Sequence, residues 1–174
     1  MNNIFMKIQS VIVYAVLEIS IALFVLYLGF MTHYYVLFYD GTYEMFEYYK
    51  QLQVFNKESF SLVIHFVVLA FLLLVFAVHK VRPGIFGLAV VLGVTVYVSL
   101  KSFLLINVLA KYKRMYLSLD FSSMEEYIPS TFVFDAGLVL HYMLIGSLII
   151  LSIISLATFI QRIKEGNPLV RKVS

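Results

Sequence analysis

Apolar residues dominate four long segments of the chain, and more polar stretches separate them. The four segments cover residues 8–30, 59–79, 85–109 and 136–160. A helix needs about 20 mainly apolar residues to cross a bilayer, and each segment is near or above that length. The pattern therefore predicts an all-α, polytopic membrane protein whose four transmembrane helices form one bundle, a single membrane domain over residues 1–174.

Composition favours the same class. The chain is 62% hydrophobic and 13% charged, with a mean hydropathy of +0.94, whereas soluble domains carry about 25% charged residues. A globule of this size could not hide so many apolar side chains. The absence of cysteine excludes disulfides and iron–sulfur ligation by thiolates. In a membrane protein the net charge of +3 bears on topology and lipid contact, so we expect the lipid bilayer as a partner and no nucleic acid.

Two long polar segments, 31–58 and 110–135, are rich in aromatic residues. Capping signals predict one short interfacial helix in each of these outer loops, over residues 42–54 and 122–128. Their tyrosines are typical of the aromatic belt at a membrane surface.

Positive charge near the ends of the predicted helices sets the orientation. The short segments on one side hold Lys7, Lys80, Arg82, Arg162, Lys164, Arg171 and Lys172. We therefore expect both termini, including a basic tail over 161–174, to be cytoplasmic and the long loops to lie outside the plasma (inner) membrane. The basic cluster from Lys111 to Arg114 favours the opposite orientation.

Short stretches of the first half recur in the second. The recurring stretches are SLVIHF (61–66) as GLVLHY (137–142), and YAVLE (14–18) as YVSLK (97–101). Because the matches keep their order, they indicate two repeated helical hairpins, over about 4–80 and 84–164. Such hairpins are parallel repeats, related by an axis along the membrane normal.

Four ionisable side chains lie within the apolar segments, one in each predicted helix: Glu18, His65, Lys101 and His141. A charge near the bilayer centre costs about 3 kcal/mol, so such residues usually face the bundle interior and pair. A stripe with four-residue spacing favours an inward-facing Lys101: Ala89, Gly93, Tyr97 and Lys101. We predict an intramembrane ion pair between Glu18 and Lys101, directly or through water. The alternative is that Lys101 extends outward to the lipid headgroups.

The two histidines carry the chemical hypotheses. His65 and His141 fall at similar depths on the second and fourth predicted helices, as the axial ligands of a b-type haem would. Such a chain would be an electron-transfer subunit. The same two imidazoles, with an outer carboxylate such as Asp135, are also the candidate ligands of a metal site. A small proton-coupled transporter or channel using Glu18, Lys101 and the histidines is a further alternative.

No catalytic motif or nucleophile signature is readable in the sequence, so an enzyme is not the favoured interpretation. The chain is small, and most helix faces are apolar. The function that these features favour is a small integral membrane subunit or accessory protein of a larger membrane complex. Its expected partners are other membrane protein subunits or further copies of itself.

Overall fold

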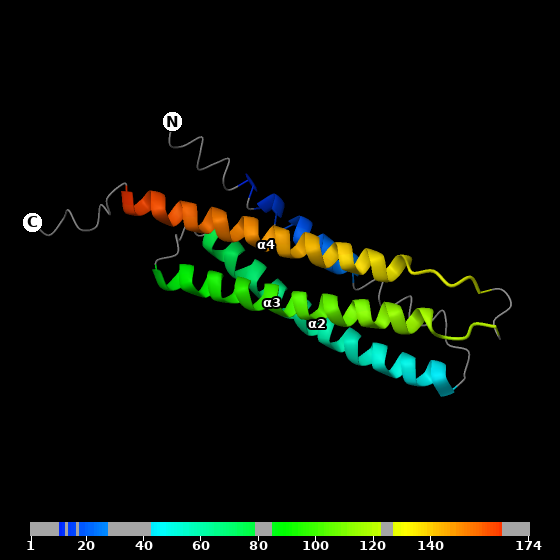
Figure 1. The fold of residues 1–174 in the computed structure, drawn as a ribbon. Coiled ribbons are helices and arrows are strands. Elements are labelled where there is room, and N and C mark those ends of the chain that lie inside the picture. The colour runs from blue at the N-terminus through cyan, green and yellow to red at the C-terminus, as the bar shows by residue number, and fades with distance from the viewer. Residues whose placement is uncertain are drawn as a thin grey trace, which may run out of the picture.

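The computed structural model describes residues 11–12, 14–16, 18–27, 43–78, 85–122 and 127–164, and these form four helices. A short apolar helix over Tyr14–Tyr27, called the N-terminal helix below, comes first. Three long helices follow: α2 (Tyr43–Val78), α3 (Ile85–Leu117) and α4 (Phe132–Lys164), which run along one another as an elongated bundle (Figure 1). The prediction of an all-α fold is confirmed.

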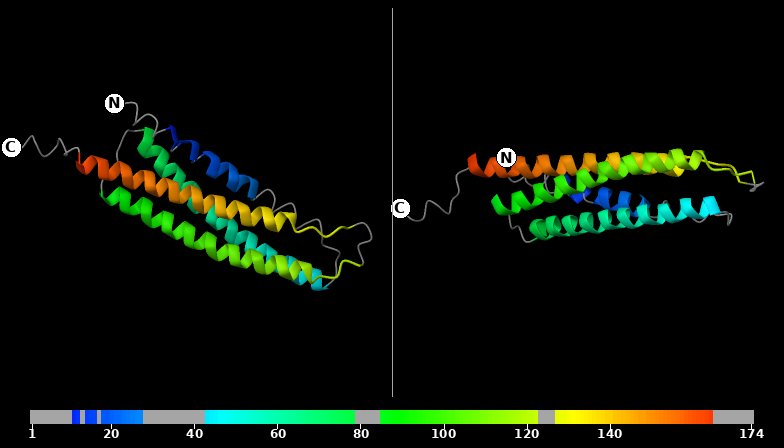
Figure 2. Two further views of the ribbon diagram at one scale, coloured as in Figure 1. Left: turned by 45° about the horizontal axis from the view of Figure 1, so that its top comes forward. Right: turned by 60° about the horizontal axis from the view of Figure 1, so that its bottom comes forward.

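Buried residues recur along each helix at alternating steps of three and four. On α2 the residues that follow this spacing are Met45, Tyr48, Leu52, Phe55, Ser59, Leu62, Phe66 and Leu69, and Val63 is buried beside them. On α3 they include Leu88, Val91, Thr95, Val98, Ser102, Leu105 and Leu109. This is the heptad pattern, which keeps one face of each helix turned toward its neighbours. α3 and α4 run alongside each other in both views of Figure 2, and α2 crosses behind them at an angle in the left view.

The contacts between helices place them in chain order around the bundle. α3 packs against both α2 and α4. The N-terminal helix contacts α2 through stacked Phe24 and Phe66 rings, whose centroids are 4.7 Å apart. It also contacts α4, where the edges of the Tyr27 and His141 rings meet at 4.8 Å. The N-terminal helix and α3 therefore lie diagonally opposite, as do α2 and α4.

The exterior of the bundle is apolar. Large exposed hydrophobic residues on α3 and α4 include Val96, Leu100, Phe103, Leu104, Val139, Ile149, Ile150 and Ile153. Three segments are long and apolar enough to cross a membrane: Tyr43–Leu69, Ile85–Leu117 and Phe132–Ala157. The predicted first span, 8–30, reaches beyond the described residues at both ends, so a fourth crossing stays a prediction.

The long helices extend past the predicted spans. α2 begins at Tyr43, so the short helix expected over 42–54 is the first part of α2 and not a separate element. α3 likewise continues to Leu117, inside the expected loop over 110–135. Hydropathy marks only the apolar part of a helix. The helix itself continues for as long as its backbone hydrogen bonds are made and one of its faces stays buried.

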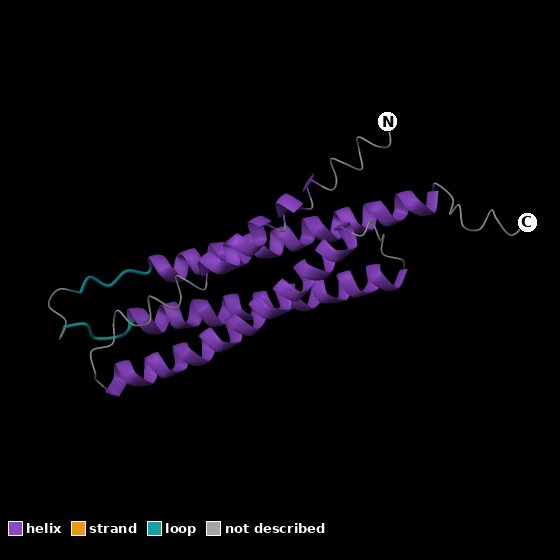
Figure 3. Ribbon diagram, turned by 180° about the vertical axis from the view of Figure 1, so that it is seen from behind, coloured by secondary structure: helices purple, strands orange, loops and turns teal. Residues whose placement is uncertain are grey.

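The second expected loop helix, over 122–128, lies partly outside the described residues. Those that are described on either side, Ser122 and Tyr127 with Ile128, are not helical. The Ser122 N–H donates to Asp120 Oδ1 over 2.9 Å, which closes a local turn and lowers the pKa of the Asp120 carboxyl. These loop segments lie at the end of the bundle where α3 ends and α4 begins (Figure 3).

Tyrosines join the helices at the end of the bundle where α2 begins and α3 ends. The Tyr48 hydroxyl on α2 donates to the Tyr112 carbonyl of α3 over 2.9 Å, and the Tyr112 hydroxyl donates back to the Gln51 carbonyl over 3.2 Å. The hydroxyls of Tyr116 and Tyr127 lie 2.7 Å apart, which holds the following loop to α3. The hydroxyls of these tyrosines therefore connect one element to the next, whereas their place in an aromatic belt at a membrane surface stays a prediction.

Candidate functional site

One polar side chain from each helix meets inside the bundle. Tyr27 comes from the N-terminal helix, Ser59 from α2, Ser102 from α3 and His141 from α4, and none exposes more than 3% of its surface. We call these four residues the inner polar layer. Buried polar groups in an apolar bundle must find partners among themselves, and these four largely do.

The heptad pattern places three members of this layer. Ser59, Ser102 and His141 each follow the preceding buried position by four residues and precede the next by three. They therefore occupy the same heptad position on α2, α3 and α4. A polar residue at such a position fixes how neighbouring helices align along their axes, because a shifted alignment would bury it without a partner.

Two hydrogen-bonded pairs make up the layer. Ser102 Oγ lies 2.6 Å from His141 Nδ1, which joins α3 to α4. The Tyr27 hydroxyl lies 3.2 Å from Ser59 Oγ, which joins the N-terminal helix to α2. Since Ser59 Oγ donates to the Phe55 carbonyl over 3.0 Å, Tyr27 is the donor of the second pair. The contact between the Tyr27 and His141 rings then connects the two pairs.

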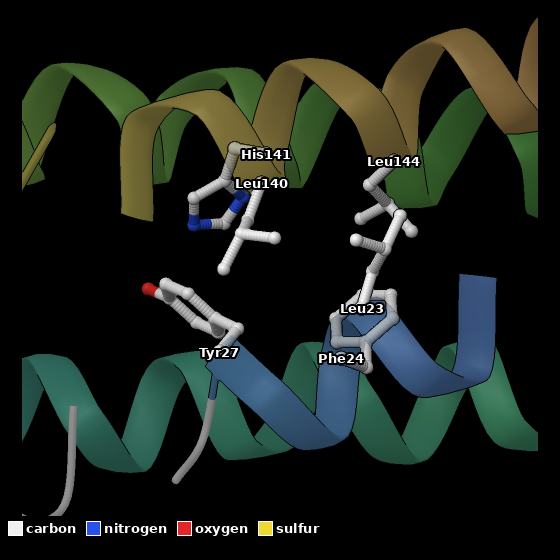
Figure 4. A pocket seen from close by; sticks show the side chains of 6 residues that line it. All are labelled: Leu23, Phe24, Tyr27, Leu140, His141 and Leu144. Atoms are coloured by element: carbon white, nitrogen blue, oxygen red, sulfur yellow. The ribbon is translucent and has the colours of Figure 1, made fainter. Parts of the chain in front are cut away.

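One atom of the layer has no partner among the described residues. His141 Nε2 is buried and makes no hydrogen bond within that part of the chain. A cavity of about 10 Å³ adjoins it, lined by Leu23, Phe24, Tyr27, Leu140, His141 and Leu144. Figure 4 shows the His141 and Tyr27 rings next to each other with Leu140 beside them, and Leu23, Phe24 and Leu144 further along the helices. The volume is that of about one water molecule, and it offers no room for a porphyrin ring.

A second group of polar residues lies on the outside, where α2 and α3 meet. Lys101 Nζ is 3.4 Å from Glu58 Oε2 and donates to Ser61 Oγ over 3.3 Å. His65 Nδ1 is 2.6 Å from the Ser61 carbonyl, and the His65 ring meets the edge of the Tyr97 ring at 5.3 Å. We call these five residues the lateral seam.

The four ionisable residues singled out in the sequence do not meet in one place. His141 lies in the inner polar layer, whereas His65 and Lys101 belong to the lateral seam, and Glu18 is exposed on the N-terminal helix. Lys101 has Glu58 as its direct ion-pair partner, the role that the sequence analysis gave to Glu18. An interaction of Glu18 with Lys101 through water stays a prediction.

The two histidines of the apparent repeat have different surroundings because of a one-residue difference in register. His141 itself occupies the buried heptad position, whereas on α2 that position is taken by Phe66, the residue after His65. One residue is a turn of about 100° around a helix, so His65 faces outward. Haem ligation by His65 and His141 stays a prediction from the sequence, and the close contacts of the two rings give it no support.

The metal hypothesis gains no support either. Within the part of the chain that the structure describes, no three His, Asp or Glu side chains gather closely enough to hold an ion. Asp135, the third ligand considered, is already engaged at the start of α4. One carboxylate oxygen lies 2.5 Å from Lys113 Nζ, and the other accepts from the Thr131 hydroxyl over 2.9 Å.

Sequence reasoning missed Tyr27, Ser59, Ser102 and Glu58. Ser59 and Ser102 could have been found from the heptad pattern, since each interrupts a run of apolar residues at a buried position. Glu58 was assigned to a loop because the outer half of α2 is polar on its exposed side. Comparison of the chain with protein-family models, with curated proteins and with solved structures finds no match.

Proposed function

We propose that this chain is a small integral membrane subunit or accessory protein of a larger membrane complex. Its four helices would cross the plasma (inner) membrane as two hairpins, over about 4–80 and 84–164, with both termini cytoplasmic. Its role would be to contribute a rigid set of helices to which other membrane proteins bind. The observation that supports this most is where the polar side chains lie. Those of the inner polar layer are hydrogen-bonded to one another inside the bundle, and the exterior of the bundle is apolar.

The interior leaves little room for a substrate or a pathway. The cavity beside His141 measures about 10 Å³, whereas pockets for small molecules typically measure 300 Å³ or more. Around it, Phe24 and Phe66 are stacked, and Leu144 and Leu148 are buried. The described part of the interior therefore favours a packing role over transport.

The two-hairpin arrangement has support in the inner polar layer. The pair of Tyr27 and Ser59 joins the two helices of the first proposed hairpin. The pair of Ser102 and His141 joins those of the second. Each hairpin thus carries one buried hydrogen bond between its own helices, although the bonded positions are not those of the repeated stretches.

Two measurements test the proposal on membranes that contain the full chain at its native level. Alkaline extraction should leave the chain in the membrane fraction, and labelling of single cysteines introduced at residues 2 and 173 should show both termini on the cytoplasmic side. Gentle detergent extraction followed by native mass spectrometry should then give one assembly of fixed stoichiometry containing this chain. Release by alkali would contradict the membrane placement, and a chain that is always isolated alone would contradict the subunit role.

A further inference from the structure

The lateral seam presents polar groups where lipid is expected. Ser61, His65, Tyr97 and Lys101 lie within the apolar segments 59–79 and 85–109, and Glu58 directly precedes the first of these segments. His65 and Glu58 are exposed, and Tyr97 exposes 47% of its surface. The residues around them are exposed and apolar: Ile64, Val68, Leu100 and Leu104. Polar side chains facing lipid are costly and are rare unless a partner covers them.

The groups that this surface offers come in complementary kinds. A carbonyl oxygen only accepts, so the contact of His65 with the Ser61 carbonyl puts the proton of the neutral ring on Nδ1. His65 Nε2 is then an acceptor, and the adjacent Tyr97 hydroxyl is a donor. Neither has a hydrogen-bond partner among the described residues. About one to two helical turns from His65 and Tyr97 along the bundle, Glu58 supplies an acid and Lys101 a base.

The same surface allows close approach. Gly93 and Ala89, about one and two turns before Tyr97 on α3, are both exposed. A side-chain carbon built onto Gly93 would meet no atom within 4 Å. The spacing of Ala89, Gly93, Tyr97 and Lys101 predicted a stripe that faces the interior, but Ala89, Gly93 and Tyr97 are exposed instead. Small residues at four-residue spacing let membrane helices pack with their backbones close together.

We propose that the lateral seam is the interface of a homodimer, in which a second copy of this chain packs α3 against α3 near Gly93. With a twofold axis along the membrane normal, a given residue lies at the same membrane depth in both copies. The same surface patch of each copy then forms the interface. Glu58 of one copy then meets Lys101 of the other, and His65 Nε2 accepts from the other copy's Tyr97 hydroxyl. This inference rests on the membrane placement in the proposed function.

Cross-linking of the full chain in liposomes tests the geometry, and the absence of native cysteine makes single-cysteine variants unambiguous. Ala89→Cys lies near the proposed axis, whereas Ile153→Cys is a comparably exposed control on α4. Under mild oxidation at high lipid dilution, Ala89→Cys should form disulfide-linked dimers and Ile153→Cys should not. Equal cross-linking at both positions would overturn the proposed interface.

Two glycines provide a matched pair of blocking variants. Gly93→Leu and Gly146→Leu both add a side chain where an added carbon meets no atom within 4 Å, so neither should disturb the single chain. In the Ala89→Cys background, Gly93→Leu should reduce cross-linking to the level of the Ile153→Cys control. Gly146→Leu, on α4, should leave it unchanged. The same effect from both substitutions would contradict the assignment of the contact to α3.

Charge reversal separates contacts between copies from contacts within one chain. Glu58→Lys gives a chain with two bases at this level, and Lys101→Glu gives one with two acids. Neither should associate with itself, but the two mixed together should, because each acid then meets a base of the other copy. Energy transfer between differently labelled chains measures this. No recovery in the mixture, or a wild-type chain that is monomeric at every dilution, would overturn the homodimer.

These outcomes are distinct from a failure of the proposed function. If the chain resists alkaline extraction but stays monomeric in liposomes, only the homodimer is contradicted. A different membrane protein or lipid would then contact the lateral seam. A chain that alkali releases from the membrane removes the basis of both proposals.

Discussion

His141 Nδ1 on α4 lies 2.6 Å from Ser102 Oγ on α3, and both side chains are buried. This contact is a buried polar link between α3 and α4. Both residues occupy the same heptad position on their helices. A shift of one helix along the other would break the hydrogen bond, so the bond stabilises the observed alignment. The stability of the bundle should therefore depend on it more than on any exposed ion pair.

Ser102→Ala should destabilise the folded protein by about 1–3 kcal/mol, because it leaves both nitrogens of the buried His141 ring without a partner. Reversible unfolding in mixed detergent micelles measures the change. Ser152→Ala is the matched control on α4, since Ser152 Oγ is buried and has no hydrogen-bond partner among the residues that the structure describes. This control should be neutral or slightly stabilising.

The double variant Ser102→Ala/His141→Leu extends this test. Replacing both partners with apolar groups removes the stranded polar atoms, so the double variant should be less destabilised than the sum of the two single variants. If the two single effects simply add, the hydrogen bond does not couple α3 to α4.

Tyr27→Phe should destabilise the protein by about 0.5–1.5 kcal/mol, less than Ser102→Ala. The substitution removes one hydrogen bond but keeps the ring against His141, and Ser59 Oγ still donates to the Phe55 carbonyl. Tyr97→Phe, measured in a detergent in which the chain is monomeric, should be neutral, since the Tyr97 ring is on the exterior. A larger loss from Tyr97→Phe than from Tyr27→Phe would contradict the assignment of Tyr27 to the interior.

The partner of Lys101 can be identified by a pair of double-mutant cycles. Lys101→Met and Glu58→Gln should couple by up to about 1 kcal/mol, the range of exposed ion pairs, because Glu58 is more than half exposed. Lys101→Met and Glu18→Gln should not couple. Coupling with Glu18 in place of Glu58 would restore the ion pair inferred from the sequence.

The absorbance spectrum of protein purified from haem-replete cells tests the cofactor hypothesis. The small cavity at His141 and the outward position of His65 lead us to expect no Soret band. Bis-histidine ligation would instead give a Soret band that disappears in both His65→Ala and His141→Ala. That result would require a rearrangement of α2 relative to α4.

The existence of the long helices could be read from the sequence, because their apolar segments are continuous. Their ends could not, as the start of α2 illustrates. Residues 43–58 alternate exposed Glu44 and Lys50 with buried Met45, Tyr48 and Leu52. A hydropathy average treats this stretch as a polar loop, whereas the heptad spacing makes it an amphipathic extension of the helix.

The candidate site could be predicted only in part for a similar reason. Ionisable residues within apolar segments, such as His141 and Lys101, can be read from the sequence, but the direction in which each side chain points cannot. Direction depends on the heptad position, and His65 misses the buried position by a single residue. Ser102, next to Lys101, was not predicted as a site residue because a serine carries no charge, yet Ser102 is the residue that faces the interior.

The central claim is that one face of each helix packs around the inner polar layer while the opposite face contacts lipid. Spin labels on single cysteines along α4, in liposomes, test it most directly through their collision rates with oxygen, which concentrates in the lipid. The account predicts high rates at Val139, Ile150 and Ile153 and low rates at Leu144 and Leu148. Uniform rates along α4, or easy access of a water-soluble nickel reagent to Val139 and Ile150, would contradict it.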